Sequence, residues 1–294
     1  MMFFLNISHL VKLHAKQLPP QVVGASFDLS YIKRTIMLSL LILIGLAGQE
    51  VEGQETKLRA IEQKAFRSGE VLEYRVHYGI LDAGEARLEI MPNLKTFGPR
   101  TAYHVVATGN SKGAFDWFFK VRDRYESYID THSIVPWLFV RRVDEGGYKI
   151  SQDVSFNHAK NTATSNKATI PTPDNVQDLV SSLYYARTID FANAKEGDLF
   201  GFDAYLDDEV FPMKIKFVGR ETIKTKHGTV RCIKFHPQLL EGRVFKDKDD
   251  MTVWISDDDN KIVIRAQAEI LVGSVKMDLK NYSGLANGFT SKIK

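Results

Sequence analysis

The stretch that decides the fold is Gly69-Glu-Val-Leu-Glu-Tyr-Arg-Val-His-Tyr-Gly79, which is followed by Ala83-Gly-Glu-Ala-Arg-Leu-Glu-Ile90. Successive side chains of a strand point to opposite faces. In the first segment the apolar side chains at 72, 74, 76 and 78 therefore share one face, and the polar side chains at 73, 75 and 77 share the other. This alternation predicts a half-buried antiparallel strand. Residues 81–84 would form the turn into a second strand.

The same pattern recurs along most of the chain. Further strands are predicted at 101–108, 121–129, 133–143, 148–156, 157–166, 199–206, 210–218, 221–225, 228–236, 251–256, 261–271 and 274–281. Residues 114–119 fit either a short helical turn or the start of a strand. Many strands with short connections predict an all-β fold, mainly an antiparallel roll or open barrel.

One amphipathic helix is expected to interrupt the strands near residues 174–190. Its apolar stripe has the spacing of a helix face and consists of Val176, Leu179, Val180, Leu183, Tyr184 and Arg187. Asp174 followed by Gln177 has the form of a capping box at its start. We expect this helix to plug or flank the sheet, with its apolar face in the core.

The chain divides into four parts on composition. Residues 1–48 form a leader, 49–68 a polar linker, 69–286 a single β-roll domain and 287–294 a C-terminal tail. In the leader, Lys33-Arg34 precedes a short apolar run at 35–47, which has the layout of a secretory signal with cleavage near Ala47 or Gly48. The run is short for a membrane span, so the mature chain is expected to have none. An uncleaved anchor is the alternative.

Charge and cysteine content limit the function classes. The first 47 residues hold four of the 39 basic residues and one of the 36 acidic residues, so the remainder is balanced at 35 of each. A balanced domain lacks the basic surface that phosphate neutralisation needs, which argues against nucleic acid as a partner. Cys232 is the single cysteine, so no internal disulfide can form. We expect it to be buried and inert rather than a nucleophile.

Motifs for catalysis or metal binding are weak. Gly109-Asn-Ser-Lys-Gly113 matches the G-x-S-x-G pattern, which makes Ser111 the nucleophile of a hydrolase only within a parallel α/β sheet. Here the neighbouring strands look antiparallel. The eight histidines have no paired spacing, and the acidic runs at 247–250 and 257–260 lack the order of ligands in a calcium loop. No metal, no cofactor and no catalytic residue is therefore predicted.

Residues 117–126 contain the richest cluster of chemistry. Alternation would place Trp117, Phe119, Val121, Asp123 and Tyr125 on one face, with Lys120, Arg122 and Arg124 on the other. A carboxylate on an apolar face needs a partner, so Asp123 is expected to have an ion pair or dense hydrogen bonding. Arg141 or Arg142 would supply the structural ion pair.

A second interpretation gives these residues a ligand. Arg122, Arg124 and Arg141 would face a groove and contact an anionic glycan or lipid head group, since guanidinium groups suit carboxylates and phosphates. Tyr125 and the three tryptophans, Trp117, Trp137 and Trp254, would line the concave side of the roll. Core packing is the other role open to these aromatic residues.

The order of several motifs resembles an exported bacterial family called domain of unknown function 3108. The motifs are Gly69-Glu-x-Leu-x-Tyr-x-Val-x-Tyr-Gly79, Ala83-Gly84, Val121-Arg-Asp-Arg124, Gly242-Arg-Val-Phe245, Val253-Trp-Ile-Ser-Asp-Asp258, Val272-Gly-Ser274 and Tyr282-Ser-Gly-Leu285. The similarity covers roughly 69–285. It implies an antiparallel β-roll and a location in the envelope of a Gram-negative bacterium. It implies no established activity, and it carries no catalytic residues over to this chain.

These observations favour an exported, non-enzymatic β protein of the periplasm or of the periplasmic face of the outer membrane. We expect it to bind or carry an amphipathic envelope ligand, a lipid or a polysaccharide, in the concavity of its sheet. A module that docks an envelope protein partner by strand addition is the alternative. A serine hydrolase that uses Ser111 is the third hypothesis.

Overall fold

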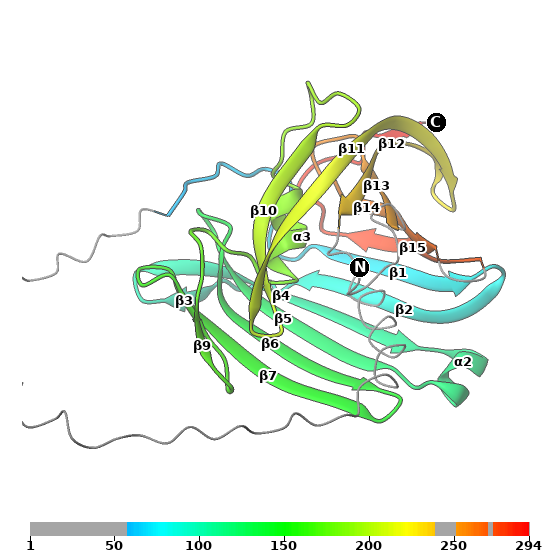
Figure 1. Ribbon diagram of the computed structural model, residues 1–294. Coiled ribbons are helices and arrows are strands. Elements are labelled where there is room, and N and C mark those ends of the chain that lie inside the picture. The colour runs from blue at the N-terminus through cyan, green and yellow to red at the C-terminus, as the bar shows by residue number, and fades with distance from the viewer. Residues whose placement is uncertain (1–57, 239–250, 270–272, 294) are drawn as a thin grey trace, which may run out of the picture.

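The computed structural model describes residues 58–238, 251–269 and 273–293. Within them, strands curl into one open roll, and a short helix lies inside the curve (Figure 1). The prediction of an all-β fold, mainly an antiparallel open roll, is confirmed. The leader lies outside the described residues, and so do the end of the strand expected at 261–271 and the motif Gly242-Arg-Val-Phe245.

All strands of the described residues belong to one sheet. Their order is β10-β11-β12-β13-β14-β15-β1-β2-β4-β5-β6-β7-β8-β9, with β3 paired to β4 and β16 paired to β12. The bounds are β1 Val71–Tyr78, β2 Leu81–Ile90, β3 Lys95–Phe97, β4 Arg100–Ser111, β5 Arg122–Asp130, β6 Pro136–Glu145, β7 Tyr148–Asn157, β8 Thr162–Thr164, β9 Thr169–Pro171, β10 Leu199–Leu206, β11 Glu209–Thr225, β12 Gly228–Gln238, β13 Met251–Ser256, β14 Val263–Glu269, β15 Ser274–Ser283 and β16 Lys292–Ile293.

The opening hairpin has the predicted alternation. Leu72, Tyr74 and Val76 are buried, whereas Tyr78 at the end of β1 is 37% exposed. The register slips between Val76 and His77, because β1 and β2 form a bulge there. The partner of Val76 across the pair is Gly84, where an added Cβ would lie 2.5 Å from the backbone oxygen of Asn110. Only glycine allows that close approach of β2 and β4.

Small residues occupy the inner face of β2 and β4. Ala86 pairs with Tyr74 on one side and with Gly109 on the other, and Leu88 pairs with Ala107. These positions share the face of the buried Tyr74, so they point into the roll. Larger side chains here would fill the centre, and their absence leaves space beneath the helix.

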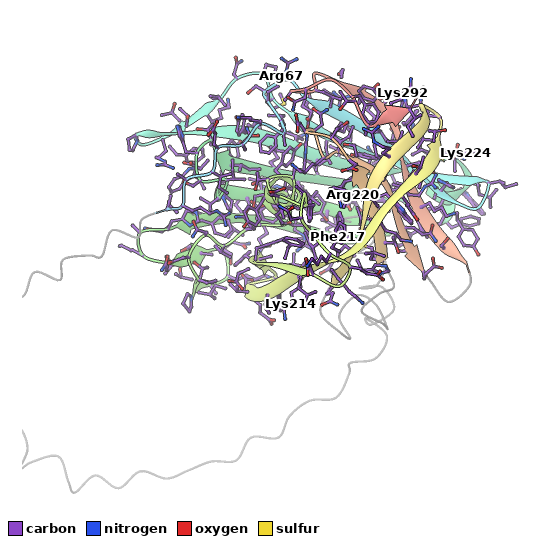
Figure 2. The ribbon with its side chains drawn as sticks, turned by 90° about the horizontal axis from the view of Figure 1, so that it is seen from above. Arg67, Lys214, Phe217, Arg220, Lys224 and Lys292 are labelled. Atoms are coloured by element: carbon purple, nitrogen blue, oxygen red, sulfur yellow. The ribbon has the colours of Figure 1, made fainter. Side chains whose placement is uncertain are left out.

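β11 is the longest strand and wraps over the roll. The sequence predicts two strands, at 210–218 and 221–225, but the structure has one strand with a bulge at Gly219, where φ is +151°. Figure 2 shows the strand running from Lys214 past Phe217 and Arg220 to Lys224. The bulge bends β11, so that its first half can pair with β10 while its second half pairs with β12.

The two ends of the sheet, β9 and β10, are linked without strand pairing between them. Gln177 N–H donates to the carbonyl of Asp203 at 2.8 Å, and Tyr205 N–H donates to the carbonyl of Gln177 at 2.7 Å. The turn between β10 and β11 has φ of 54° and 60° at Asp207 and Asp208, a conformation that aspartate tolerates. Arg141 on β6 forms an ion pair with Asp207 at 2.6 Å, which fastens this turn across the roll.

The inserted helix, α3, is Ser181–Ala186, much shorter than the predicted span near 174–190. The expected capping box at Asp174 and Gln177 is wrong, because the backbone of Gln177 pairs with β10 and cannot enter a helix. Asp178, just before α3, holds the start of the helix instead, since its Oδ1 accepts the N–H groups of Val180 and Ser181, each at 2.7 Å. The expectation that the helix plugs the roll agrees with its buried face and with its place in Figure 1.

Packed residues extend beyond the predicted domain of 69–286. Ala65 and Phe66, in the segment expected to be a linker, are 4% and 2% exposed. In the expected tail, Ser291 is buried and β16 pairs with β12. The strand predicted at 157–166 is reduced to β8, while β3, β9 and β16 were not predicted from the sequence.

Candidate functional site

The roll holds a partly open apolar cavity of about 80 Å³ between α3 and the strands β11 to β15. Its lining includes Leu183 on α3, Ile215 on β11, Val253 on β13, Ala266 on β14 and Met277 on β15. This volume is below the range of about 300–1,000 Å³ that is usual for small-molecule sites, so the cavity as it stands has room for a narrow apolar group. Its apolar lining suits a hydrocarbon group.

Tyr74 brings a hydroxyl group to this apolar wall. Its ring lines the cavity, its side chain is 1% exposed, and its Oη has no hydrogen-bond partner in the described part of the chain. Burial raises the pKa of Tyr74 far above its ordinary value, so the hydroxyl keeps its proton and can donate it. A buried donor without an acceptor is costly, and an oxygen atom of a ligand would satisfy it.

A second cavity of about 50 Å³ adjoins the first and shares Tyr74, Leu88, Leu183 and Met277 with it. The small inner residues Ala86, Ala107 and Gly109 line it. Gly109 lies two residues before the end of β4, so this cavity extends toward the end of the sheet where α2, Gly113–Phe118, follows β4. We refer to the two adjoining cavities together as the hollow.

Asp178 holds α3 in the hollow. Its side chain is 0% exposed, and Ser127 Oγ on β5 donates to its Oδ2 at 2.5 Å, in addition to the two backbone donors. Burial raises the pKa of Asp178 to about 6, although these hydrogen bonds oppose that change. The carboxyl group fixes the start of α3 to the inner face of the sheet.

A buried ion pair fixes the other end of α3. Arg187 Nη1 and Nη2 donate to the two carboxylate oxygens of Glu70 at 2.6 and 2.8 Å. Its remaining donors reach the carbonyls of Ala65 at 2.8 Å and Asn260 at 3.0 Å. The guanidinium group therefore joins the segment before β1, α3 and the loop between β13 and β14. Burial lowers the pKa of Arg187, but the adjacent Glu70 carboxylate outweighs it and the net direction is upward.

The structure separates the arginines that were predicted to share a groove. Arg124 pairs in register with Arg142, and Tyr125 pairs with Arg141, so Arg141 points inward while Arg122 and Arg124 point outward. That prediction is wrong because side chains alternate between the two faces of the sheet, and the pairing of β5 with β6 puts Arg141 on the opposite face from Arg122 and Arg124. Arg122 binds Asp116 at 2.7 Å, and Arg124 binds Glu126 at 2.9 Å, both on the outer face. Of the predicted ligand residues, only Tyr125 lines a described cavity.

The three tryptophans occupy three different environments. Trp117 lies on α2 and is 85% exposed, so it does not share the inner face with Val121 and Tyr125. The Nε1 group of Trp137 donates to Asp130 at 3.1 Å. Trp254 is 9% exposed, and its Nε1 group donates to Glu221. Trp254 lies between Val253 and Ile255, which line the large cavity, and does not line it itself.

Asp123 lies on the inner face, as the alternation predicts, and is 5% exposed. Its Oδ1 accepts the backbone N–H of Asp144 at 3.3 Å, which agrees with the expectation of hydrogen bonding. The arginines proposed as its partners form ion pairs elsewhere, Arg141 with Asp207 and Arg142 with Asp153, both at 2.6 Å. Asp123 also borders the smaller cavity.

Ser111 ends β4 in an antiparallel sheet and is 3% exposed. Its Oγ donates to Asp116 and accepts the N–H of Val121 at 2.8 Å and a guanidinium N–H of Arg122 at 3.3 Å. Hydrogen bonds from Arg122 and then Ser111 lower the pKa of Asp116 to about 2. So weak a base does not activate a serine hydroxyl. Among the described residues, no histidine is hydrogen-bonded to Ser111.

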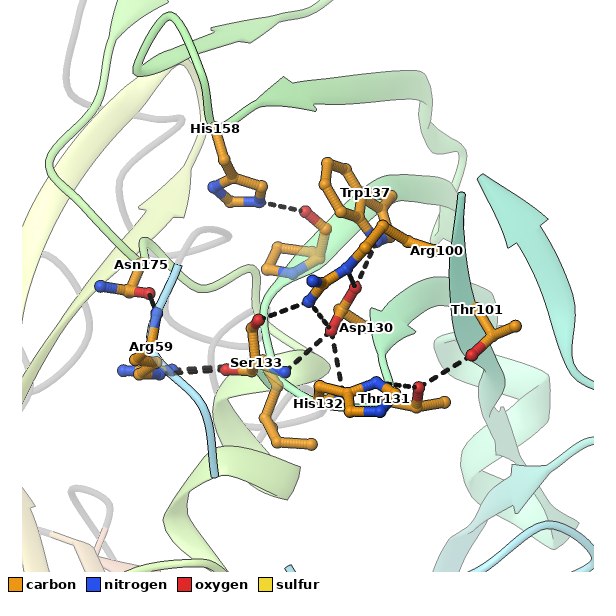
Figure 3. A network of polar contacts seen from close by, with 12 residues as sticks. Arg59, Arg100, Thr101, Asp130, Thr131, His132, Ser133, Trp137, His158 and Asn175 are labelled. Atoms are coloured by element: carbon orange, nitrogen blue, oxygen red, sulfur yellow. Dashed lines mark hydrogen bonds and ion pairs between the residues drawn. The ribbon is translucent and has the colours of Figure 1, made fainter. Parts of the chain in front are cut away.

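A polar network fixes the far end of the sheet (Figure 3). Asp130 is 0% exposed and accepts hydrogen bonds from Arg100 at 2.8 and 2.7 Å and from the N–H groups of His132 and Ser133 at 2.9 and 2.8 Å. Burial raises the pKa of Asp130, but the donors outweigh it and the net direction is downward. The network holds the β5–β6 turn, and it lies outside both cavities.

Sequence reasoning missed most of the residues that line the hollow. The inner positions of β11 to β15 carry ordinary apolar residues, which are indistinguishable from core by pattern alone. One available signal was the run of small residues at Ala83-Gly84, Ala86, Ala107 and Gly109, because small side chains on an inner face leave space. A second was Arg187 within an apolar stripe, which signals a buried partner.

Comparisons with known proteins give a family and a fold. A family model described as "Protein of unknown function (DUF3108)" matches residues 73–280. No protein with a curated description matches the chain. A crystal structure described as a beta-barrel-like protein of domain of unknown function DUF1849, from Brucella abortus, is similar at a TM-score of 0.50 and 11% identity, over 74% of this chain and 99% of that one.

Another solved structure, described as "a putative lipoprotein" from Parabacteroides distasonis, has a TM-score of 0.34 and 12% identity, over 76% of this chain and 99% of that one. Of these two structures, only the Brucella protein supports an argument, and it supports the barrel-like β fold alone. Within the described residues, neither helix has the length or hydropathy needed to cross a bilayer.

Proposed function

Because the chain belongs to the DUF3108 family, which is defined without an activity, we propose a function from the hollow itself: the protein holds the acyl chain of an envelope lipid. The observation that carries the proposal is the apolar lining of the cavity between α3 and β11 to β15, together with the buried hydroxyl of Tyr74, which has no hydrogen-bond partner among the described residues. Of the two ligand classes expected from the sequence, this lining favours lipid over polysaccharide, since sugars need many polar contacts.

The proposed location is the periplasm or the periplasmic face of the outer membrane. The basic flank and apolar run at 33–47 support export. The role is non-enzymatic, and it needs no cofactor. The bonds made by Ser111, which engage its hydroxyl in a structural turn, support that part of the proposal.

Filling the cavity tests the proposal. Ala266 lines the cavity, whereas Ala268, two residues further along β14, is 0% exposed and does not line it. We expect Ala266→Leu to weaken binding of a dansyl-labelled undecanoic acid by roughly tenfold, with unfolding free energy unchanged or higher, because the new side chain fills empty space. Ala268→Leu is the matched control: it should lose about 1–3 kcal/mol by overpacking and retain the binding.

Fluorescence titration and urea denaturation measure the two effects, and native mass spectrometry of protein from envelope extracts identifies the natural ligand. Equal probe affinity in wild type and Ala266→Leu would contradict the proposal. So would spectra that contain a stoichiometric protein partner and no lipid, a result that would favour the docking module in which an edge strand of the sheet pairs with the partner.

The hydroxyl of Tyr74 gives a second prediction. We expect Tyr74→Phe to leave the free energy of unfolding unchanged or raise it by about 1 kcal/mol, because the variant removes an unsatisfied buried donor. Affinity for the carboxylate probe should nevertheless fall about tenfold, since the ligand oxygen loses its donor. A residue with a purely structural role would show loss of stability and no change in affinity. Parallel denaturation and titration distinguish the two.

A further inference from the structure

Exposed apolar side chains gather at the end of the sheet where α2 lies beside the β1–β2 turn. We name this set the aromatic rim; it consists of Ile80 at 93% exposure, Leu81 at 67%, Phe115 at 36%, Trp117 at 85% and Phe118 at 71%. The N–H of Lys112, just before α2, donates to the carbonyl of Ala83 at 2.9 Å, so the two elements are directly joined. Figure 1 shows both at the same end of the molecule.

Exposure of this degree is unusual for so many large apolar residues in one place, and such a patch marks an interaction site. The rim consists of the β1–β2 turn and the short helix α2, and the rings of Trp117 and Phe118 lie edge to face with centroids 5.4 Å apart. Tryptophan is suited to the boundary between head groups and acyl chains because its indole has a polar N–H group on an apolar ring, and the phenylalanine beside it adds apolar surface.

The charges around the rim fit a phospholipid surface. Each carboxylate that flanks the rim forms an ion pair: Asp82 with Arg75, Glu85 with Lys112, Asp116 with Arg122 and Asp144 with Lys149. Lys120, two residues after the end of α2, is exposed and adds a further positive charge. Paired carboxylates repel lipid phosphates little, and the added lysine attracts them.

The rim lies at the end of the sheet toward which the smaller cavity extends. Ala86 and Gly109, which line that cavity, are two residues from Gly84 and Ser111, the last pair of β2 and β4 before the rim. We propose that the aromatic rim inserts into the surface of a phospholipid bilayer and so places the hollow next to its lipid. Insertion at the rim stands on its own observations, whereas the delivery of a lipid rests on the function proposed above.

A local probe tests the insertion independently of any contact made by the leader. Vesicles of phosphatidylethanolamine and phosphatidylglycerol with brominated acyl chains should quench part of the tryptophan emission of the chain purified from the envelope. The variant Trp117→Phe should lose that quenchable part, because Trp137 and Trp254 are not exposed at the rim. Wild-type emission that bromine leaves unchanged would overturn the proposal.

A double variant tests the contribution of the rim to binding. Trp117→Ser with Phe118→Ser should reduce co-sedimentation with unbrominated vesicles roughly tenfold when the leader has been cleaved. Leu94→Ser is the matched control, since Leu94 is 47% exposed but lies at the opposite end of β2. An equal loss of vesicle binding in Leu94→Ser would overturn the proposal. So would a double variant that still binds vesicles but no longer binds a protein partner.

The dansyl probe separates this proposal from the function of the cavity. The double variant should bind the soluble probe as the wild type does, because no rim residue lines either cavity. Probe binding without quenching at Trp117 would refute the rim and leave the cavity function intact. Quenching at Trp117 without probe binding would refute the cavity function and leave the rim proposal intact.

Discussion

Replacing Arg187 with methionine is expected to lower the free energy of unfolding by about 3–5 kcal/mol, because it leaves the carboxylate of Glu70 buried without its partner. The side chains of Arg187 and Glu70 are 7% and 0% exposed, and the guanidinium group also satisfies the carbonyls of Ala65 and Asn260. Urea denaturation followed by tryptophan fluorescence measures the loss.

Two further variants separate the buried charge from the loss of packing. Arg187→Met combined with Glu70→Gln should recover part of the stability, since no uncompensated charge remains. Arg142→Met is the exposed control: its ion pair with Asp153 has side chains 44% and 58% exposed, and its loss should cost about 0–1 kcal/mol. If Arg187→Met and Arg142→Met were equally stable, the ion pair would not anchor α3.

Asp130→Ala should have an effect of similar size, about 3–5 kcal/mol, because Arg100 loses its buried partner and the N–H groups of His132 and Ser133 lose their acceptor. The indole N–H of Trp137 loses its acceptor as well, so a shift in tryptophan emission should accompany the loss. Asp144→Ala, which removes an exposed ion pair with Lys149, is the control and should have little effect.

The carboxylate of Asp130 makes the free energy of unfolding depend on pH in the acidic range. The pKa of Asp130 is lower in the folded protein than in the unfolded chain, so the folded state releases this proton more readily. Its contribution is therefore fully present above the unfolded pKa, about 3.9, and is lost as the pH falls through the lower folded value. Asp130→Asn should flatten the stability profile below about pH 4 relative to wild type. An unchanged profile would show that another group dominates there.

The fold was largely predictable because each β-strand carries its own signal. The alternation of residues 72, 74 and 76 fixed the first strand, and the same rhythm located most of its neighbours. The limits of the helix were not predictable, because Val176 fits a helical stripe and Gln177 fits a capping box. The pairing of Gln177 with β10 is a contact between residues far apart in sequence, which local propensity does not encode.

The site was less predictable than the fold for a related reason. Alternation assigns Tyr125 and Arg124 to opposite faces of one strand, but it does not say which face of the next strand lies on the same side. Arg141 was grouped with Arg122 and Arg124, and the register of β5 with β6 reverses that grouping. The cavity itself depends on how far the sheet curls and on where α3 stops, and both are set by tertiary packing.

The central place of β1 in the sheet has a consequence for assembly. Val71 at the start of β1 pairs with Ser283, near the C-terminus, so one neighbour of β1 is the last long strand to be synthesised. Pairings between distant residues form slowly, since a long loop must close first. The N-terminal half can stack β1 to β9 in order, but that partial sheet keeps an open edge at β1. We therefore expect the emerging chain to be most vulnerable to aggregation and proteolysis in this interval, and to become protected only when β15 arrives.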